Sequence, residues 1–307
     1  MAHTLKIQPL YSFLFYYYML YGINDLITIA KVCYYSNYVY DENRLSVLYI
    51  ARPERGKTTI FNRFYSKKTL KVDDISQKTI LDYAERYFQT NKYKSMYLPD
   101  FVSLANHSYS TVNSTISLIN RLVEEGIKDG LFYGLEYHFT KPVKIGMFVP
   151  ITPNFFIKLF KRFNDIGFLS RFVPISYEYS ESTRLSILQE TVVKSKTEPE
   201  KPVRISAPKI YDVVVPEDIK QALQIQLEPV LKRLNDFKVI TYDKKGNRSY
   251  ITPDPQLGIR LNKKMLVFLK AYAVMQNPKK PQVTYQTLSE VIRLFDYIRY
   301  PDNPKMI

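Results

Sequence analysis

The feature that most constrains this sequence is a short, mostly apolar run that leads directly into a loop ending in Gly56-Lys57-Thr58. The run, from Leu45 to Ile50, has the pattern of a strand buried on both faces. A strand of that kind belongs to a parallel sheet that helices cover on both sides. Helical spacing resumes after Gly56. The segment therefore predicts a strand, a loop and a helix in direct succession.

The loop fits the phosphate-binding pattern G-x-x-x-x-G-K-[ST] at every position but the first, where Ala51 replaces glycine. In such a loop the backbone N–H groups wrap the phosphates, the lysine neutralises the β and γ oxygens, and the hydroxyl holds Mg²⁺. Alanine disfavours the positive φ that glycine adopts freely. The flanking strand and helix favour a phosphate site over a surface turn rich in Arg and Lys. The predicted nucleotide contacts are Pro53, Glu54, Arg55, Gly56, Lys57, Thr58 and Thr59.

A nucleoside triphosphatase with such a loop also needs an acidic ligand for its metal. Asp100 follows a candidate strand over 93–98, so Thr58 and Asp100 are the predicted Mg²⁺ ligands. Asp100 could equally cap a helix that begins at Phe101. Phe101 stands where such ATPases usually carry the Glu that orients the attacking water. Slow hydrolysis is therefore one expectation, and a base from elsewhere is the other, with Asn106 and the pair Glu124–Glu125 as candidates.

The rest of the pattern alternates strands with helices. Further strands are predicted over 131–139, 143–149 and 172–177, and helices over 80–88, 110–126 and 154–164. This alternation indicates an α/β fold with a mostly parallel sheet flanked by helices. A hairpin is predicted over 239–251, with helices before and after it.

The chain divides into four predicted parts. The first is helical and holds the apolar stretch 10–21, which is too short to span a bilayer and has no signal-peptide flanks. A stretch rich in Pro, Lys and Glu separates the core from a C-terminal helical lid. The parts are an N-terminal helical segment (1–43), a P-loop α/β core (44–191), a linker or surface loop (192–209) and the lid with its hairpin (210–307).

The net charge of +15 favours polyanionic partners, meaning nucleic acid or an anionic membrane surface. The alternative is that the charge only keeps the protein soluble. The single cysteine, Cys33, excludes an intramolecular disulfide framework, and three scattered histidines argue against a Cys/His metal site. A reducing, cytoplasmic setting without a membrane is expected.

Four places carry a resemblance to the AAA+ ATPases. They are the loop up to Thr59, Asp100, "IGMFVPITPNFF" and "IGFLSRFVPIS". A later stretch, "GIRLNKKMLVFLKAYAVM" followed by "VTYQTL", is similar to the family's lid. Within the family the chain looks like the minichromosome-maintenance type of helicase and its relatives in archaeal viruses and plasmids, and its many Tyr and lack of Trp resemble such proteins too. The resemblance covers residues 40 to 298 and lacks the family's N-terminal DNA-binding domain.

The resemblance implies a role at each place. Thr152 or Asn154 would sense the γ-phosphate. Arg171 would be the arginine finger that reaches the nucleotide of a neighbouring subunit, and Arg260 would be sensor 2. ATP and Mg²⁺ would be the cofactors, a ring of identical subunits the assembly, and DNA the substrate in replication or maintenance of a mobile element. Such a protein would work in the cytoplasm, which is the host's if a virus or plasmid encodes it.

The hairpin tip is the predicted nucleic-acid contact. Its basic residues are Lys244, Lys245 and Arg248, flanked by Tyr242 and Tyr250. Lysine neutralises phosphates, and tyrosine can stack on an exposed base. An ordinary solvated hairpin is the alternative.

Two other functions fit the same sequence. Residues 103–127 resemble a winged helix-turn-helix, which would make the protein a DNA-binding regulator. Alternatively, the protein is a degenerate P-loop protein that binds nucleotide without turnover and has a structural role.

Overall fold

The structure, a computed structural model, describes residues 23–40, 43–106, 108–132, 135–193, 201–242 and 247–301. Two sequence predictions lie outside these residues. One is the apolar helix over 10–21, and the other is the pair Lys244 and Lys245 at the hairpin tip.

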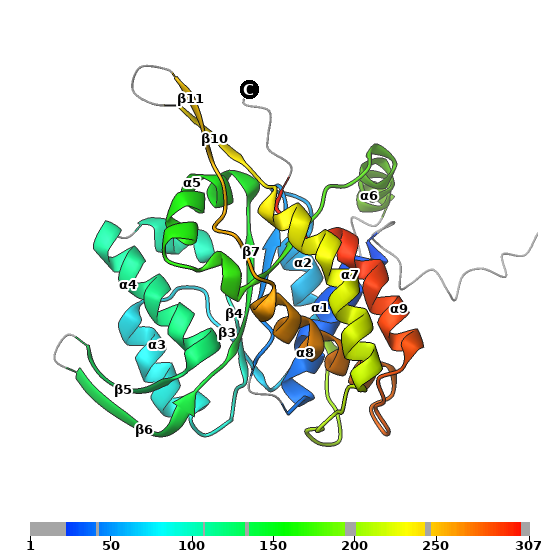
Figure 1. The fold of residues 1–307 in the computed structure, drawn as a ribbon, viewed down its shortest axis with the longest axis horizontal. Coiled ribbons are helices and arrows are strands. Elements are labelled where there is room, and N and C mark those ends of the chain that lie inside the picture. Colours follow the sequence, from blue (N-terminus) through cyan, green and yellow to red (C-terminus); the bar gives the residue numbers. More distant parts are fainter. Residues whose placement is uncertain are drawn as a thin grey trace, which may run out of the picture.

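A five-stranded parallel sheet forms the centre of the molecule, in the order β3-β4-β7-β1-β8 (Figure 1). Every neighbouring pair in it is parallel. All residues of β1, β7 and β8 are buried, because helices cover both faces of the sheet. The predicted α/β fold and its buried central strand are confirmed. The strands are β1 (Val47–Ile50), β3 (Thr69–Lys71), β4 (Ser95–Tyr97), β7 (Gly146–Ile151) and β8 (Val173–Ser176).

Two layers of helices enclose the sheet (Figure 1). One layer holds α3 (Gln77–Tyr83), α4 (Tyr109–Asn120) and α5 (Pro153–Asp165). The other holds α1 (Asn24–Tyr35), α2 (Lys57–Asn62), α7 (Glu217–Asn235), α8 (Ile259–Gln276) and α9 (Tyr285–Arg293). Helix α3 continues as a π-helix over Ala84–Phe88 and α4 over Arg121–Glu125, so both predicted helices extend as far as their patterns indicate.

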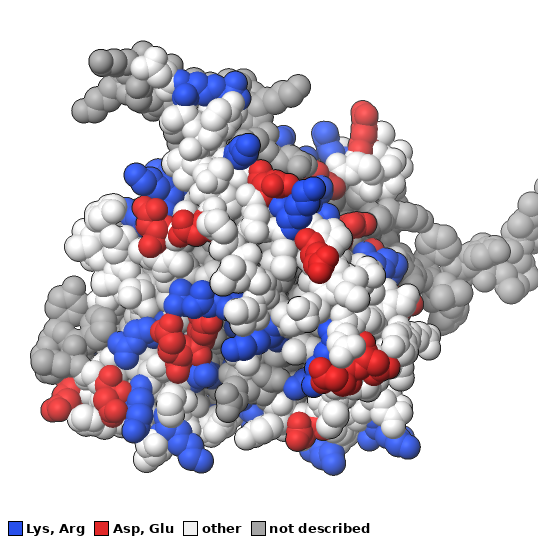
Figure 2. All heavy atoms as spheres, viewed as in Figure 1, with Lys and Arg blue, Asp and Glu red and all other residues white. Residues whose placement is uncertain are grey.

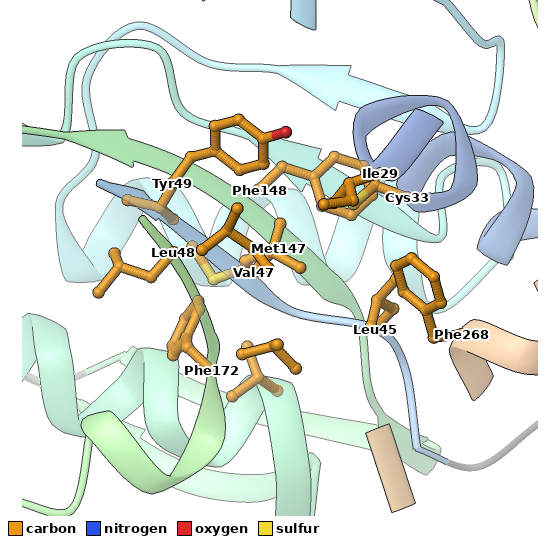
Figure 3. Packing of buried hydrophobic residues seen from close by; sticks show 14 of the residues in the cluster. Ile29, Cys33, Leu45, Val47, Leu48, Tyr49, Met147, Phe148, Phe172 and Phe268 are labelled. Carbon is orange, nitrogen blue, oxygen red and sulfur yellow. The ribbon is translucent and has the colours of Figure 1, made fainter. Parts of the chain in front are cut away.

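Side chains of β1 and β7 alternate between the two faces (Figure 3). Tyr49 and Phe148 point to the face that α1 covers, where the Tyr49 hydroxyl donates to the backbone oxygen of Leu26 at 2.6 Å. Phe61 of α2 packs edge-on against Tyr49, with ring centroids 5.0 Å apart, and stacks on Phe148 at 6.0 Å. Helix α2 has only six residues, so this aromatic packing fixes its position and that of the loop before it.

One predicted strand is wrong in its limits. The stretch 131–139 does not form a single strand of the central sheet. It contributes to an antiparallel hairpin of β5 (Ile127–Phe132) and β6 (Leu135–Val143), which forms a sheet of its own. The apolar pattern runs through this stretch without showing that the chain reverses direction.

The predicted linker over 192–209 includes an ordered contact. Helix α6 (Glu181–Val193) extends over its first two residues, and β9 (Val203–Arg204) within it pairs with β2 (Phe64–Tyr65). Ile205, directly after β9, is buried. The buried apolar residues of the lid and of the α/β core belong to one cluster that reaches from Ile23 to Tyr300. The division of the chain into domains stays a prediction.

The predicted hairpin is present, formed by β10 (Val239–Tyr242) and β11 (Arg248–Ile251). It projects from the body of the molecule (Figure 1). Within the described ranges, no helix combines the length and the apolar character that a bilayer crossing would require.

Candidate functional site

The loop between β1 and α2 leaves the sheet at the edge where the parallel strands end, called here the carboxyl edge. Ala51 extends the strand, and its N–H donates to the oxygen of Ile151 on β7 at 3.2 Å. Its side chain is fully buried. The loop residues with positive φ are Glu54, at 62°, and Gly56, at 70°. Ala51 does not have a positive φ, so an alanine is not disfavoured at this position, contrary to the expectation. The missing first glycine therefore causes no backbone conflict.

The Lys57 side chain folds back onto its own loop. Its ammonium group donates to the backbone oxygens of Ala51 at 2.7 Å and Arg52 at 2.9 Å. Burial lowers the pKa of Lys57, and the carboxylate of Glu178 partly offsets that effect. The ammonium is thus placed at the mouth of the loop, where it can exchange carbonyl partners for the oxygens of an anion. Pro53, Thr58 and Thr59 are exposed around it.

A segment directly after β8 also contacts the loop, and sequence reasoning missed it. The hydroxyls of Tyr177 and Tyr179 both donate to the backbone oxygen of Arg55, at 2.8 Å and 2.5 Å. Between them, Glu178 forms ion pairs with Arg52 at 3.0 Å and Arg55 at 3.3 Å. The available signal was the sequence Tyr-Glu-Tyr at the end of a predicted strand, because parallel strands end at the same edge as the loop.

Thr152 and Asn154 lie at the carboxyl edge as well. They follow β7, the direct neighbour of β1. The Thr152 hydroxyl caps α5 by accepting the N–H of Phe155 at 3.3 Å, which leaves its own hydrogen available for another acceptor. Asn154 is exposed in the first turn of α5. Both residues are therefore at the edge where the loop lies.

Asp100 is at the same edge but farther along it. It follows β4, which β7 separates from β1. Asp100 is exposed and precedes a 3-10 helix over Phe101–Asn106. Phe101 is buried and stacks on Phe168 with centroids 6.0 Å apart. The position that usually supplies a catalytic Glu therefore points into the core.

Asp73 is a second carboxylate at this edge that sequence reasoning missed. It follows β3 and is exposed. Burial raises the pKa of Tyr97, the Thr58 hydroxyl lowers it, and the charge of Asp73 raises it further. Val72, the residue before Asp73, donates its N–H to the backbone oxygen of Tyr97 at 3.0 Å, so Asp73 lies beside the end of β4. The only sequence signal was an acidic pair, Asp73-Asp74, after the short alternating stretch Thr-Leu-Lys-Val.

Arg171 and Arg260 lie at the opposite edge, where the strands begin, called here the amino edge. Arg171 ends a 3-10 turn directly before β8, and β8 runs parallel to β1. A four-residue strand is about 13 Å long, so Arg171 is separated by at least that much from the loop of its own chain. The expectation that Arg171 serves a different subunit is compatible with this placement. Arg260 lies at the same edge; its predicted role as sensor 2 left open which subunit's nucleotide it would contact.

One carboxylate joins these two arginines. Glu124 pairs with Nε of Arg171 at 2.9 Å and with Nε of Arg260. Glu125 pairs with Nη2 of Arg171 at 2.7 Å. Glu124 and Arg260, together with Ser170, line a cavity of about 530 Å³. Glu124 and Glu125, which were considered as sources of a base, therefore lie at the edge of the sheet opposite the loop of their own chain.

The hairpin carries the described part of the predicted nucleic-acid contact. Arg248 and Tyr250 are exposed, and the guanidinium of Arg248 lies over the Tyr250 ring, 5.0 Å from its centroid. Figure 2 shows basic side chains on this projection, whereas acidic and basic side chains are interspersed over the body below it.

The helix-turn-helix alternative does not match the local structure. Its first helix would have to end near Asn106, where the chain forms a six-residue 3-10 helix. Its second helix is α4, whose buried side chains include Ile116 and Ile119 in the core of the α/β fold. The segment 103–127 therefore lacks the pair of α-helices that this motif requires.

Comparison with known proteins adds only a general likeness in fold. No protein family matches the chain, and no curated protein is significantly similar to it. A solved structure from Cytophaga hutchinsonii, described as a "putative ATPase", is similar with a TM-score of 0.40 and 11% sequence identity. The match covers 89% of this chain and 81% of that one. At this TM-score no residue role is transferred from it.

The shared carboxylate at the amino edge makes a stability prediction. Glu124→Gln removes the charge that pairs with two guanidinium groups, and the Arg171 side chain is only 13% exposed. We expect a loss of about 2 kcal/mol in the free energy of unfolding, because a poorly solvated arginine loses part of its compensation. Denaturant unfolding measures it.

Glu125→Gln is the matched control. The Glu125 side chain is 53% exposed and pairs with Arg171 alone. Its loss should cost less than about 1 kcal/mol, as for other exposed ion pairs. Equal effects of the two substitutions would contradict a central role for Glu124.

Proposed function

We propose that this protein is a P-loop ATPase of the AAA+ type that binds ATP and Mg²⁺ at the carboxyl edge of its sheet. The observation that carries the proposal is the position of Lys57. Its ammonium group closes a loop that connects a central parallel strand to a helix, and the loop's glycine, Gly56, has the left-handed φ of 70° that favours glycine.

The topology supports this location for a ligand. In open parallel α/β sheets, ligands bind outside the carboxyl ends of the strands, where chain connections leave adjacent strands in opposite directions. Here the chain leaves β1 toward β3 at one side of the sheet and leaves β7 toward β8 at the other. The loop lies at the resulting crevice between β1 and β7. A triphosphate there would face Lys57 and Thr152.

The residues at this edge fit a magnesium nucleotide. Mg²⁺ is usually held by one or two oxygen ligands of the protein together with phosphates and water. Thr58 supplies a hydroxyl, and Asp100 and Asp73 supply exposed carboxylates at the same edge. When bound, Mg²⁺ would neutralise phosphate charge. Lys57 would bind phosphate oxygens, and the Thr152 hydroxyl or Asn154 would donate to the terminal phosphate.

We further propose that the protein works as a ring of identical subunits. Arg171 and Arg260 are at the amino edge, so they can serve only a nucleotide bound to a neighbouring chain. Assembly would present the neighbour's phosphates to these guanidinium groups in competition with Glu124 and Glu125. Both arginines would then contribute to the same intersubunit site.

DNA is the proposed substrate, in replication or maintenance of a mobile element, as in relatives of the minichromosome-maintenance helicases. The support is the net charge of +15 and the projecting hairpin with its exposed Arg248 and Tyr250. Arginine neutralises phosphates, and tyrosine provides a stacking surface for a base.

One observation favours a second candidate function. The buried Phe101 removes the usual position of the catalytic Glu. The protein could then bind nucleotide without turnover and act as an assembly factor. Multiple-turnover phosphate release from ATP distinguishes the two: an ATPase releases many equivalents, and a binding protein releases none.

The first prediction concerns the loop lysine. Lys57→Ala should weaken binding of a fluorescent ATP analogue with Mg²⁺ by at least about tenfold, because the charge-assisted contact to the phosphates is lost. Fluorescence anisotropy measures it. Lys78→Ala, an exposed lysine on α3, is the control and should bind like wild type. A folded wild type that binds no nucleotide would refute the proposed function.

The second prediction concerns the ring. Lys57→Ala and Arg171→Ala should each abolish ATP hydrolysis alone. A mixture of the two should regain part of the activity, because an intact site forms wherever a Lys57→Ala subunit presents its Arg171 to the intact loop of an Arg171→Ala subunit. Phosphate release by the mixture, compared with each variant at the same total concentration, measures this. Two inactive variants whose mixture stays inactive, although native mass spectrometry shows mixed rings, would exclude the intersubunit role.

The third prediction concerns the hairpin. Replacing both Arg248 and Tyr250 with Ala should weaken binding of a single-stranded oligonucleotide by about tenfold and reduce its salt dependence, because a stacking surface and a phosphate contact are lost. Arg86→Ala, which removes an exposed arginine from the body, should have little effect. Equal affinities for the hairpin variant and wild type would show that any DNA contact lies elsewhere on the protein.

A further inference from the structure

The segment Tyr177–Tyr179 holds one peptide group of the loop from outside. Both phenol hydroxyls donate to the backbone oxygen of Arg55. A carbonyl oxygen has two lone pairs, so the two phenols together satisfy its full accepting capacity. This oxygen belongs to the peptide bond between Arg55 and Gly56, at the point where the loop turns into α2. The segment therefore fixes the orientation of that peptide plane.

The orientation of the carbonyl determines the orientation of the Gly56 N–H. No cis peptide bond occurs among the described residues, and in a planar trans peptide the C=O and the N–H point in opposite directions. The carbonyl faces the tyrosines, so the N–H faces away from them. In a phosphate-binding loop, the N–H groups that point inward are the donors to phosphate oxygens.

We propose that Tyr177 and Tyr179 are positioning residues that turn the Gly56 amide toward a nucleotide's phosphates. This inference rests on the proposed nucleotide site and deepens it. The ligand class is a nucleoside di- or triphosphate, since a phosphate-binding loop of this type encloses the phosphates beyond the first. Neither phenol has to touch the ligand for this role.

The close approach of Tyr179 to the loop requires a glycine at position 56. A Cβ atom at Gly56 would lie 2.8 Å from the Tyr179 hydroxyl oxygen, and the φ of 70° already disfavours a side chain there. Gly56 therefore permits Tyr179 to approach the loop closely enough to bind the Arg55 oxygen. The guanidinium of Arg55 lies over the Tyr179 ring, 5.6 Å from its centroid, which adds a second contact between the segment and the loop.

Both phenols remain hydrogen donors at neutral pH. Burial raises the pKa of Tyr179 to about 12, although Arg55 acts to lower it. Burial also raises the pKa of Tyr177 well above its ordinary value. The two hydrogen bonds to the Arg55 oxygen therefore persist throughout the range in which nucleotide binding would be measured.

The test compares phosphate-dependent binding between matched variants. The double variant Tyr177→Phe with Tyr179→Phe keeps both rings and removes both hydroxyls. We expect its affinity for ATP and ADP with Mg²⁺ to fall by about tenfold, because the Gly56 donor loses its fixed orientation. Affinity for AMP should change by less than about twofold. Isothermal titration calorimetry measures all three ligands.

Tyr49→Phe is the matched control. The Tyr49 hydroxyl is fully buried and donates to the backbone oxygen of Leu26 on α1, not to the loop. Phenylalanine at this position keeps the ring that packs against Phe61 and Tyr177 and removes only that hydrogen bond. This variant should lose stability like the others and keep the affinity of wild type for ATP. The single variant Tyr179→Phe, which changes a half-buried residue, provides a second test if the double variant does not fold, and should weaken ATP by about threefold.

Three outcomes would overturn the inference. They are unchanged ATP affinity in the folded tyrosine variants, an equal loss for AMP and ATP, and the same loss in Tyr49→Phe. If wild type binds no nucleotide at all, the proposed function itself fails, and that result is visible before any variant is compared.

Discussion

The structure depends on the buried parallel pairing of β1 between β7 and β8. Every residue of β1 is shielded from water, so the strand is held by its backbone hydrogen bonds and by side chains that reach both faces. Tyr49 and Phe61 illustrate the second contribution, because they join the strand to α1 and α2. A loop that leaves such a strand starts from a fixed point. Since the parallel strands all end at one edge, the residues that follow β4, β7 and β8 lie at the same edge as the loop.

The two edges of the sheet hold two separate groups of charged side chains, and the members of each group have partners within the chain. At the carboxyl edge, Glu178 pairs with Arg52 and Arg55, while Lys57 binds backbone oxygens. At the amino edge, Glu124 is shared by two arginines. Both groups are thus stable without a ligand. A single carboxylate is a weaker competitor than a polyphosphate, which carries several charges and offers many acceptors, so an exchange of partners at either edge would favour a nucleotide.

Local patterns in the sequence were sufficient to predict the strand, loop and helix around Gly56, the hairpin over 239–251 and most helices. Features that depend on contacts between distant segments were not accessible. The reversal between β5 and β6, the pairing of β9 with β2, and the burial of Phe101 all belong to this second group. The effect of Ala51 was also misjudged, because the backbone places its left-handed residues at Glu54 and Gly56 instead.

The sequence by itself determined which residues could hold a phosphate, because Gly56, Lys57 and Thr58 must be consecutive to act together. Only the tertiary structure decided what surrounds them. Strand order places Thr152 beside the loop and brings Tyr177–Tyr179 against the Arg55 oxygen. The parallel direction of β8 puts Arg171, which precedes that strand, at the opposite edge. The physical reason is that hydrophobic periodicity reports which side of an element is buried, whereas the order of strands in a sheet is set by packing among elements that are far apart in the chain.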